Sequence, residues 1–338
     1  MGSHSKNKNV TVLDVAKVAG VSKSTVSLVL TQSEKVSEKS KLKVQKAMDE
    51  IGYVYNRDAA SLRSRRSNLV AIVINDLTNP YAAQLVVGLE KHISEMGLFS
   101  MIVNSGEDVE RQQRLVRNLK EYNVVAFIIC PAPGTTAKWT NDLNNQGFPV
   151  INIMREISGS KVPTVLPDNV NGTSLATQHL LSKGFRRIAF LGGNEAISDY
   201  HERLEGYVSA MKKGKVRSPK KYQIQSETNR HGGRQALEKA LKIEPDLEAI
   251  VCFSDVVAYG AIEKMRELGK KPGKEIAVVG FDDLKDSRLM SPSLSSVKID
   301  ADKIGAATCQ ILKKIREQKK PRSKILVDIE LIERDSSQ

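Results

Sequence analysis

Apolar residues recur at helical spacing near the amino terminus of the chain. Val12 and Val15 form one apolar stripe with the adjoining Ala16, and Val26 and Val29 form a second. Residues at i, i+3 and i+4 share one face of a helix. The pattern predicts two short amphipathic helices.

The residues at the predicted helix ends suit those positions. Thr11 can cap the first helix, with Asp14 as its reciprocal partner. Gly20 can end that helix in a left-handed conformation, and Ser22 can cap the second helix. This layout is typical of a helix-turn-helix, whose second helix enters the DNA major groove. A helical hairpin packed in a core has the same pattern and is the alternative.

A third helix is predicted over 37–51, with Ser37 as its cap and Gly52 at its end. Together the three helices predict a small all-α domain over 10–55. In the polar, basic segment 56–68, Asn56 could cap a helix of two turns. Isolated helices that short are marginal in water, so we expect this one to form only when it is held by other groups.

From Leu69 onward, short β-branched apolar runs alternate with amphipathic helical stretches. Such βαβ units build open parallel sheets with helices on both faces, and about 270 residues with this many strands predict two lobes. Ligands of these sheets bind beyond the carboxyl ends of the strands. Buried strands are predicted at 69–74, 99–104, 124–130, 149–154, 186–192, 248–254 and 275–281, and helices at 80–96, 108–121, 170–183, 199–213, 231–242 and 256–268.

Positive charge is concentrated at the amino-terminal end. The chain of 338 residues has a net charge of +13, of which residues 1–68, with thirteen Lys and Arg against six Asp and Glu, supply +7. A surface that replaces counterions around phosphates has this charge, although a basic arm can also serve solubility alone.

Cys130, Cys252 and Cys309 are odd in number and widely spaced. They are interpreted as free thiols in a reducing cytoplasm, two of them within apolar runs, and not as metal ligands or disulfides. No segment is long and apolar enough for a membrane span or a signal peptide.

Several motifs follow one another in a specific order and spacing. They are TVLDVAKVAGVSKSTVSLVL (11–30), NRDAASL (56–62), NPY (79–81), GTSLATQHLLSKGFRRIAFLGG (172–193), RLEGY (203–207), SDVVAYGA (254–261) and VVGFDD (278–283). With them the chain resembles the lactose/galactose repressor family over nearly its whole length. The resemblance implies a DNA-binding transcriptional regulator, specifically a repressor, whose operator affinity is controlled by a small-molecule effector.

The resemblance also implies an architecture. A helix-turn-helix head (10–55) and a hinge helix with its linker (56–68) would precede a two-lobed α/β core, like periplasmic sugar-binding proteins, with parallel sheets. The amino-side lobe would comprise 69–165 with 299–327, and the carboxy-side lobe 166–298 with 328–338; a final strand is expected over 325–333. A homodimer on a near-palindromic double-stranded operator is expected, because a symmetric interface suits a two-fold site and the chain stops where tetrameric relatives carry an extra helix.

Three residues of the second helix fall where relatives place base-reading side chains. Lys23 can donate to guanine, Ser24 can pair with several base edges, and Leu28 can contact a thymine methyl group. Alternatively, Lys23 meets only phosphate and Leu28 helps bury the helix. Phosphate contacts are expected from Thr11, Ser22, Thr25, Ser27, Gln32 and Asn56.

In the predicted hinge helix, Leu62 stands at the position where the family places a leucine that inserts into the DNA minor groove. A leucine from each subunit would insert between central base pairs and kink the duplex, with Arg57 and Ala59 beside the DNA. The alternative is that Leu62 merely covers the junction between domains.

Effector-binding residues are expected at strand ends in both lobes. A Tyr can stack on a ring of the ligand. An Arg can donate hydrogen bonds to ligand hydroxyl groups, and an Asp can accept hydrogen bonds from them. Asp282 could instead bond backbone amides, and Arg203 could form a lobe-closing ion pair. The candidates are Asp76, Asn79, Tyr81, Asn104 and Arg155 in one lobe, and Arg203, Thr228, Ser254 and Asp282 in the other.

The family favours a sugar or sugar derivative as effector, with a purine as the alternative. Thr228 and Ser254 depart from residues common among relatives, which leaves the effector's identity open. A transport binding protein shares the core fold, but the helical head and missing signal peptide argue against it. An enzyme is not expected, because the sequence has no nucleophile elbow, no phosphate-binding loop and no His or Cys residues at metal-ligand spacing. No cofactor or metal is implied.

Overall fold

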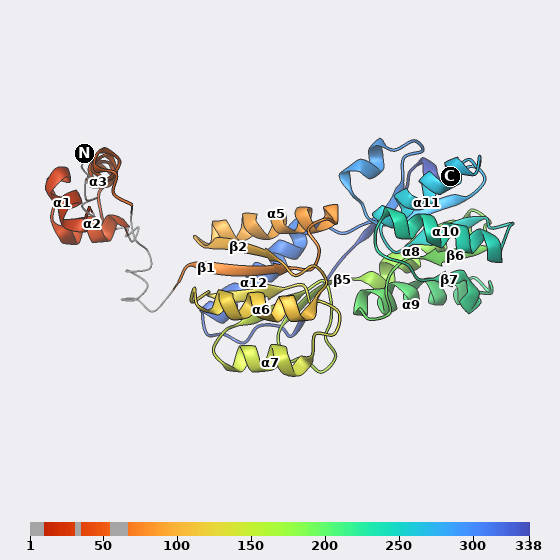
Figure 1. The fold of residues 1–338 in the computed structure, drawn as a ribbon, viewed down its shortest axis with the longest axis horizontal. Coiled ribbons are helices and arrows are strands. Elements are labelled where there is room, and N and C mark those ends of the chain that lie inside the picture. Colours follow the sequence, from red (N-terminus) through yellow and green to blue (C-terminus); the bar gives the residue numbers. More distant parts are fainter. Residues whose placement is uncertain (1–9, 31–34, 55–66) are drawn as a thin grey trace, which may run out of the picture. The chain divides into compact units, whose positions relative to one another are not determined.

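The computed structural model describes residues 10–30, 35–54 and 67–338. The chain divides into two compact units, Met1–Arg66 and Ser67–Gln338, which are described separately. Figure 1 shows the three helices of the first unit and the two α/β lobes of the second.

The first unit contains α1 (Val12–Ala19), α2 (Lys23–Leu30) and α3 (Glu38–Ile51). The predicted caps are confirmed: Thr11 and Asp14 form a reciprocal capping box, and Gly20 adopts φ 63° after α1. Val15, Val26 and Val44, one from each helix, are fully buried at the centre of a small core. The two predicted amphipathic helices therefore pack against the third through the apolar stripes seen in the sequence.

The second unit contains two six-stranded sheets. The first has the order β11-β5-β4-β3-β1-β2, and all its strands are parallel. Its strands are β1 (Leu69–Ile74), β2 (Phe99–Asn104), β3 (Ala126–Ile129), β4 (Val150–Ile153), β5 (Thr164–Pro167) and β11 (Lys324–Val327). Three helices that follow its strands, α5 (Pro80–Glu95), α6 (Val109–Lys120) and α7 (Ala137–Asn145), lie in the same lobe (Figure 1).

The second sheet has the order β12-β10-β9-β8-β6-β7, with only β12 antiparallel. Its strands are β6 (Ile188–Leu191), β7 (Gln223–Ile224), β8 (Ala249–Cys252), β9 (Ala277–Asp282), β10 (Ser295–Lys298) and β12 (Glu330–Ile332). Its lobe holds α8 (Asn169–Ser182), α9 (Ser198–Lys213), α10 (Arg230–Ile243) and α11 (Asp255–Glu267). The two-lobed core with parallel sheets is thus confirmed.

The chain crosses between the lobes more than once. After β10 it returns to the first lobe, where α12 (Ala301–Arg316) packs along α5, and β11 then joins the first sheet. The expected single strand over 325–333 is wrong, because this segment divides into β11 on one sheet and β12 on the other. Apolar residues recur on both sides of Asp328, so the sequence gives no sign that the chain changes sheets there.

A second expectation is corrected at β2. The segment 99–104 was expected to be a buried strand, but it lies at the edge of the first sheet, where Phe99 is 52% and Ile102 40% exposed. A central strand and an edge strand can have the same run of apolar residues, so only the order of strands in the sheet reveals that β2 is exposed. The three cysteines are free and buried, as predicted.

Candidate functional sites

The second helix of the head presents its predicted base-reading residues to solvent. Lys23, Ser24 and Leu28 are exposed, whereas Val26 on the opposite side is fully buried. Leu28 is 39% exposed, so burying the helix accounts for only part of its surface. An exposed face of the second helix is what a helix-turn-helix presents to the major groove.

Three hydroxyl groups gather at the start of α2. The Ser22 hydroxyl lies 2.7 Å from that of Ser24 and 2.8 Å from that of Thr25, and it accepts a hydrogen bond from the Thr25 backbone N–H at 3.1 Å. Ser22 therefore caps α2 as predicted. Since hydroxyl groups rotate freely, the same groups can exchange these mutual hydrogen bonds for phosphate oxygens.

Other predicted DNA-binding residues have different placements. The Thr11 hydroxyl is engaged with Asp14 in the capping box, and Ser27 is exposed on α2. Gln32, Asn56, Arg57, Ala59 and Leu62 lie outside the described residues.

A cavity of about 570 Å³ opens between the two core lobes. It lies at the carboxyl ends of the strands, where the sequence predicted ligand-binding residues. Eight of the nine predicted residues line it: Asp76, Asn79, Tyr81, Arg155, Arg203, Thr228, Ser254 and Asp282.

Asn104 is not among the residues that line the cavity. Its side-chain oxygen accepts hydrogen bonds from the backbone N–H groups of Leu77 at 3.4 Å and Gly106 at 3.3 Å. The residue is the last of β2, and this placement at the carboxyl end of a strand suggested a ligand contact. Instead it holds two loops that shape the edge of the cavity.

Arg203 is held in a fixed position on α9. It is 3% exposed; its Nε donates to the Asn169 side-chain oxygen at 2.9 Å, and its Nη1 donates to the Phe253 carbonyl. The guanidinium also lies 3.8 Å from the ring centroid of Phe281 and 4.6 Å from that of Phe253. Such stacking and hydrogen bonding leave the guanidinium few directions in which to move.

Asp282 ends β9 beside Arg203, with Nη1 and Oδ1 3.9 Å apart. The residue is 4% exposed and adopts φ 113°, a strained value for a residue other than glycine. Burial raises the pKa of this carboxyl well above its usual range, although Arg203 acts in the opposite direction. A buried carboxyl with one distant cation is suited to accept a hydrogen bond from a ligand hydroxyl.

Two further polar atoms of the cavity lack partners. The Tyr81 hydroxyl and the Ser254 hydroxyl are buried and find no hydrogen-bond partner among the described residues. Burial, with Asp282 as the next cause, raises the pKa of Tyr81 well above its usual range, so this phenol stays protonated. Unpaired buried hydroxyls cost free energy, and a bound ligand could satisfy them.

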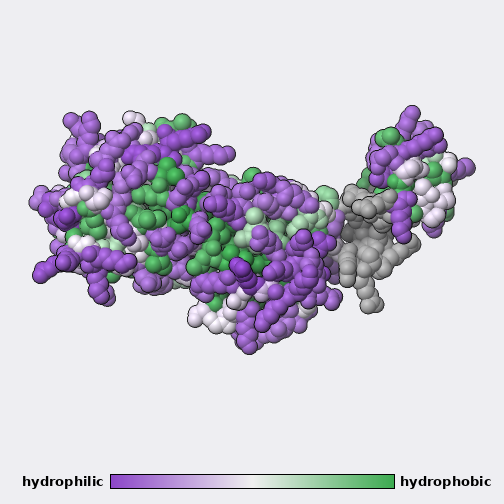
Figure 2. Space-filling model, turned by 180° about the vertical axis from the view of Figure 1, so that it is seen from behind, coloured by the Kyte–Doolittle hydropathy of each residue, from purple (hydrophilic) through white to green (hydrophobic). Residues whose placement is uncertain are grey.

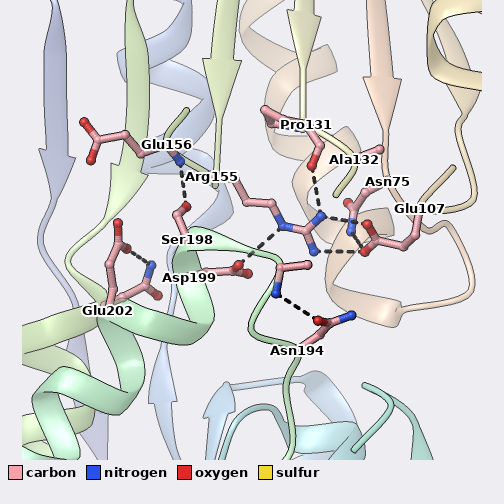
Figure 3. A network of polar contacts seen from close by, with 12 residues as sticks. Asn75, Glu107, Pro131, Ala132, Arg155, Glu156, Asn194, Ser198, Asp199 and Glu202 are labelled. Atoms are coloured by element: carbon pink, nitrogen blue, oxygen red, sulfur yellow. Dashed lines mark hydrogen bonds and ion pairs between the residues drawn. The ribbon is translucent and has the colours of Figure 1, made fainter. Parts of the chain in front are cut away.

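Arg155 follows β4 and joins the two lobes. Its guanidinium donates to both carboxylate oxygens of Glu107, at 2.7 and 2.9 Å, and to the Pro131 carbonyl at 2.9 Å. From the other lobe, Asp199 on α9 places a carboxylate oxygen 3.4 Å from its Nε. Figure 3 shows the guanidinium between these groups, with Asn75 donating to Glu107.

The ion pairs change the titration of this group. Burial opposes the charged form, but Asp199 and Glu107 raise the pKa of Arg155 above its usual value. Burial also acts against the Glu107 anion, yet hydrogen bonds from Arg155 hold the pKa of Glu107 below its usual range. Arg155 therefore lines the cavity as a charged group whose donors are largely used by the protein.

Sequence reasoning missed several cavity residues. Glu107 and Asn75 lie in loops after β2 and β1, and their place beyond strand ends was a signal that could have found them. Phe253 directly follows β8 and carried the same signal, whereas Asp199 gave none, since an acidic residue is common in the first turn of a helix. The missed lining residues include Asn75, Glu107, Asn194, Asp199, Gln225 and Phe253.

Two features are absent from the described residues, a cluster of metal-ligating side chains and a membrane-spanning helix. Within 10–30, 35–54 and 67–338, no group of three or more His, Cys, Asp or Glu side chains is placed to hold a metal ion. No helix in these ranges combines the length and apolar character needed to cross a membrane.

Comparison with known proteins gives two family matches. Residues 11–56 match the bacterial regulatory proteins of the lacI family, and residues 67–335 match the periplasmic binding proteins and sugar binding domain of the LacI family. The HTH-type transcriptional regulator GalR of Escherichia coli (strain K12) is 30% identical over 288 residues, which are 85% of this chain and 84% of GalR.

Two solved structures share the fold over nearly the whole chain. The lac repressor dimer bound to operator and the anti-inducer ONPF has a TM-score of 0.85 at 25% identity, covering 98% of this chain and 99% of that chain. The complex of the transcriptional regulator CelR with cellobiose has a TM-score of 0.72 at 27% identity, covering 97% and 99%.

Proposed function

Because this chain belongs to the lacI family of bacterial regulatory proteins, we propose that it represses transcription as a homodimer bound to a near-palindromic operator. A small molecule in the core cavity would control this binding. The helix-turn-helix head supplies the DNA-binding surface, and the two-lobed core supplies the regulatory site. Family relatives such as GalR are transcriptional regulators and not enzymes, which supports a binding role for the cavity.

The observation that carries the effector site is the set of unsatisfied polar groups in the cavity. The hydroxyls of Tyr81 and Ser254 lack partners among the described residues, and the buried Asp282 carboxyl has only a cation 3.9 Å away. A ligand with several hydroxyl groups would pair with all three. The cavity of about 570 Å³ has room for a mono- or disaccharide.

The charges of the cavity favour an uncharged effector. Five carboxyl groups line it, against two guanidinium groups. Both guanidinium groups are already bonded, Arg155 to Glu107 and Arg203 to Asn169. A phosphate or carboxylate on the ligand would face this excess of carboxyl groups, and Arg203, whose hydrogen bonds go to neutral groups, is the one of the two guanidinium groups without a hydrogen-bonded carboxylate. We therefore propose a neutral sugar or sugar derivative, with a purine as the alternative; the cellobiose bound by CelR supports the sugar class.

Coupling between effector and DNA would follow from lobe movement. A ligand that touches Tyr81 in one lobe and Asp282 in the other favours the lobe arrangement in which both contacts form. That arrangement would set the spacing of the two hinge segments in the dimer and so the affinity for the operator. Leu62 in the segment 56–68 would insert into the minor groove of the bound operator.

The dimer partner would cover apolar surface on the core. The edge strand β2 exposes Phe99 and Ile102, and the neighbouring α5 exposes Val87, which is 67% exposed. Figure 2 shows apolar residues at the surface of the core among polar ones. A second copy of the chain that pairs through this edge would bury these side chains. The resulting two-fold symmetric dimer would match the symmetry of a near-palindromic operator.

A thermal-shift screen of the full-length protein tests this function. Neutral mono- and disaccharides, phosphorylated sugars, uronates and nucleobases are each compared with buffer, because a ligand of the native state raises the melting temperature. We expect at least one neutral sugar to raise it and its phosphorylated counterpart to have no effect. Stabilisation only by phosphorylated or acidic compounds would contradict the charge argument, and stabilisation only by nucleobases would favour the purine alternative.

A further inference from the structure

A second concentration of positive charge lies in the core, separate from both sites described above. It is formed by the last turn of α12 and the loop that follows it. We call it the α12 basic cluster; its members, all exposed, are Lys313, Lys314, Arg316, Lys319, Lys320 and Arg322. A single carboxylate, Glu317, lies among them and pairs with Lys319 at 2.8 Å. Among residues 67–338, the other five cations form no ion pair.

Support for the helix itself explains only half of this cluster. Cations in the last turn of a helix interact favourably with its dipole, which accounts for Lys313, Lys314 and Arg316. Lys319, Lys320 and Arg322 lie beyond the end of α12, where that effect has faded. Their charges repel one another and therefore call for a different explanation.

The position of the cluster within the lobe indicates a partner. α12 runs back along the parallel sheet before β11, so its carboxyl end lies at the same end of the lobe as the start of β1 (Figure 1). Residue 67, where the core begins, therefore lies at this end. The chain that reaches it from the helix-turn-helix includes Arg63, Arg65 and Arg66.

From these observations, and resting on the operator binding proposed above, we infer that the α12 basic cluster contacts the phosphate backbone of duplex DNA flanking the operator. The twelve residues of segment 55–66 can span at most about 40 Å, so a head bound to its half-site limits the distance of this end of the core from the same duplex to about that reach. Phosphates are the chemical complement of six exposed cations, and such contacts carry no sequence preference. The interaction thus adds affinity for DNA longer than the operator without changing which operator is chosen.

The carboxy-side lobe provides a matched control. Lys212, Lys213 and Lys215 also gather at the end of a helix, with two cations in the last turn of α9 and one beyond it, all exposed. They belong to the other sheet's lobe, whose strands also point their carboxyl ends at the cavity, so they lie at the opposite end of the core. Replacing these three lysines by Gln removes the same charge from the chain as replacing Lys319, Lys320 and Arg322 by Gln.

The test uses the full-length protein and an operator that the protein selects from a random duplex pool. The dissociation constant of the protein is measured for two duplexes, a short one that just covers the operator and an extended one with about two more helical turns on each side. Each measurement is made from about 50 to 200 mM KCl. For Lys319→Gln/Lys320→Gln/Arg322→Gln we expect at least about fivefold weaker binding to the extended duplex and less than about twofold weaker binding to the short one. The slope of log K against log salt on the extended duplex should become shallower by about 0.9 for each phosphate that the variant no longer neutralises.

The control variant Lys212→Gln/Lys213→Gln/Lys215→Gln should match the unmodified protein on both duplexes. The charge-conserving variant Lys319→Arg/Lys320→Arg should keep the affinity, which separates charge from a folding defect. Unchanged binding of the extended duplex by the triple variant would overturn the inference and leave an acidic protein as the partner to seek. Equal weakening on both duplexes, or with the control variant, would also overturn it, since net charge alone would explain that result.

Discussion

The Nε of Arg155 and a carboxylate oxygen of Asp199 lie 3.4 Å apart across the boundary between the two lobes. Arg155 is anchored in its own lobe by the paired hydrogen bonds to Glu107, so Asp199 is the member that moves with the other lobe. Beside it, the Ser198 hydroxyl accepts a hydrogen bond from the Glu156 backbone N–H at 2.8 Å. These interactions hold the lobes in the arrangement described here and can form only when the lobes approach.

Replacement of Asp199 by Asn should loosen the lobes. The neutral amide keeps the size of the side chain but removes the charge that faces Arg155, so we expect a larger radius of gyration for the ligand-free protein in small-angle scattering. The free energy of unfolding should fall by about 1–3 kcal/mol. Glu107→Gln is the control, because it weakens an interaction with the same guanidinium within one lobe and should leave the radius unchanged. Identical scattering from both variants and the unmodified protein would contradict this role.

The Ser254 hydroxyl should matter for the effector and not for the fold. It is buried without a partner among the described residues, so Ser254→Ala removes an unsatisfied group and should leave the free energy of unfolding unchanged or raise it by up to about 1 kcal/mol. The rise in melting temperature caused by the effector should shrink in this variant. Ser287→Ala is the comparison: its hydroxyl donates to the buried Asp255, so its removal should destabilise the protein. A destabilised Ser254→Ala with full effector response would refute the assignment.

Asp255 should make stability depend on pH. Burial raises the pKa of this carboxyl from 3.8 to about 7, although Ser287, Ser296 and the Leu284 N–H donate to it. The unfolded chain loses this proton near the ordinary value and the folded chain holds it longer. The contribution of Asp255 to stability therefore falls as pH rises from about 4 to about 7, by up to about 4 kcal/mol, and is constant above that range.

The Asp255→Asn variant removes this titration. Between about pH 5 and pH 8, the free energy of unfolding should fall for the unmodified protein relative to the variant, as measured by urea denaturation. The comparison between the two proteins cancels the other titrating groups. A difference that stays the same at both pH values would show that Asp255 titrates normally.

Lys23 should contribute to operator choice. Its side chain is exposed at the start of α2, and a lysine donating to guanine discriminates against other bases by about 1–3 kcal/mol. Lys23→Ala should relax the selected sequence at one position of each half-site when the operator is recovered from a random pool. Lys46→Ala removes an equal charge from the exposed face of α3 and should weaken binding evenly without altering the selected sequence. Unaltered selection by Lys23→Ala would assign this residue to phosphate binding alone.

The elements of the fold could be predicted where local pattern decides them. Thr11, Gly20 and Ser22 specify the ends of two helices by short-range hydrogen bonds, and these ends were found. Strand order depends on long-range pairing, and so the exposure of β2 and the division of 325–333 between two sheets could not be read from the sequence.

The same distinction applies to the cavity. Residues at or just beyond the carboxyl ends of strands, such as Asp282 and Asp76, could be placed there because parallel strands bring these ends together. Their individual roles depend on partners distant in the sequence: Arg155 is bonded to Glu107, and Asn104 faces away into its own loops. Only the three-dimensional arrangement shows which polar groups remain available to a ligand.

The central claim is that occupation of the cavity and binding of DNA are linked, and reciprocal titration tests it most directly. The affinity for the selected operator is measured with and without the compound that raises the melting temperature, and the affinity for that compound with and without operator. Linkage requires both affinities to change by the same factor, which we expect to lie between about 5 and 150. A compound that binds the cavity yet leaves the operator affinity unchanged would contradict the account.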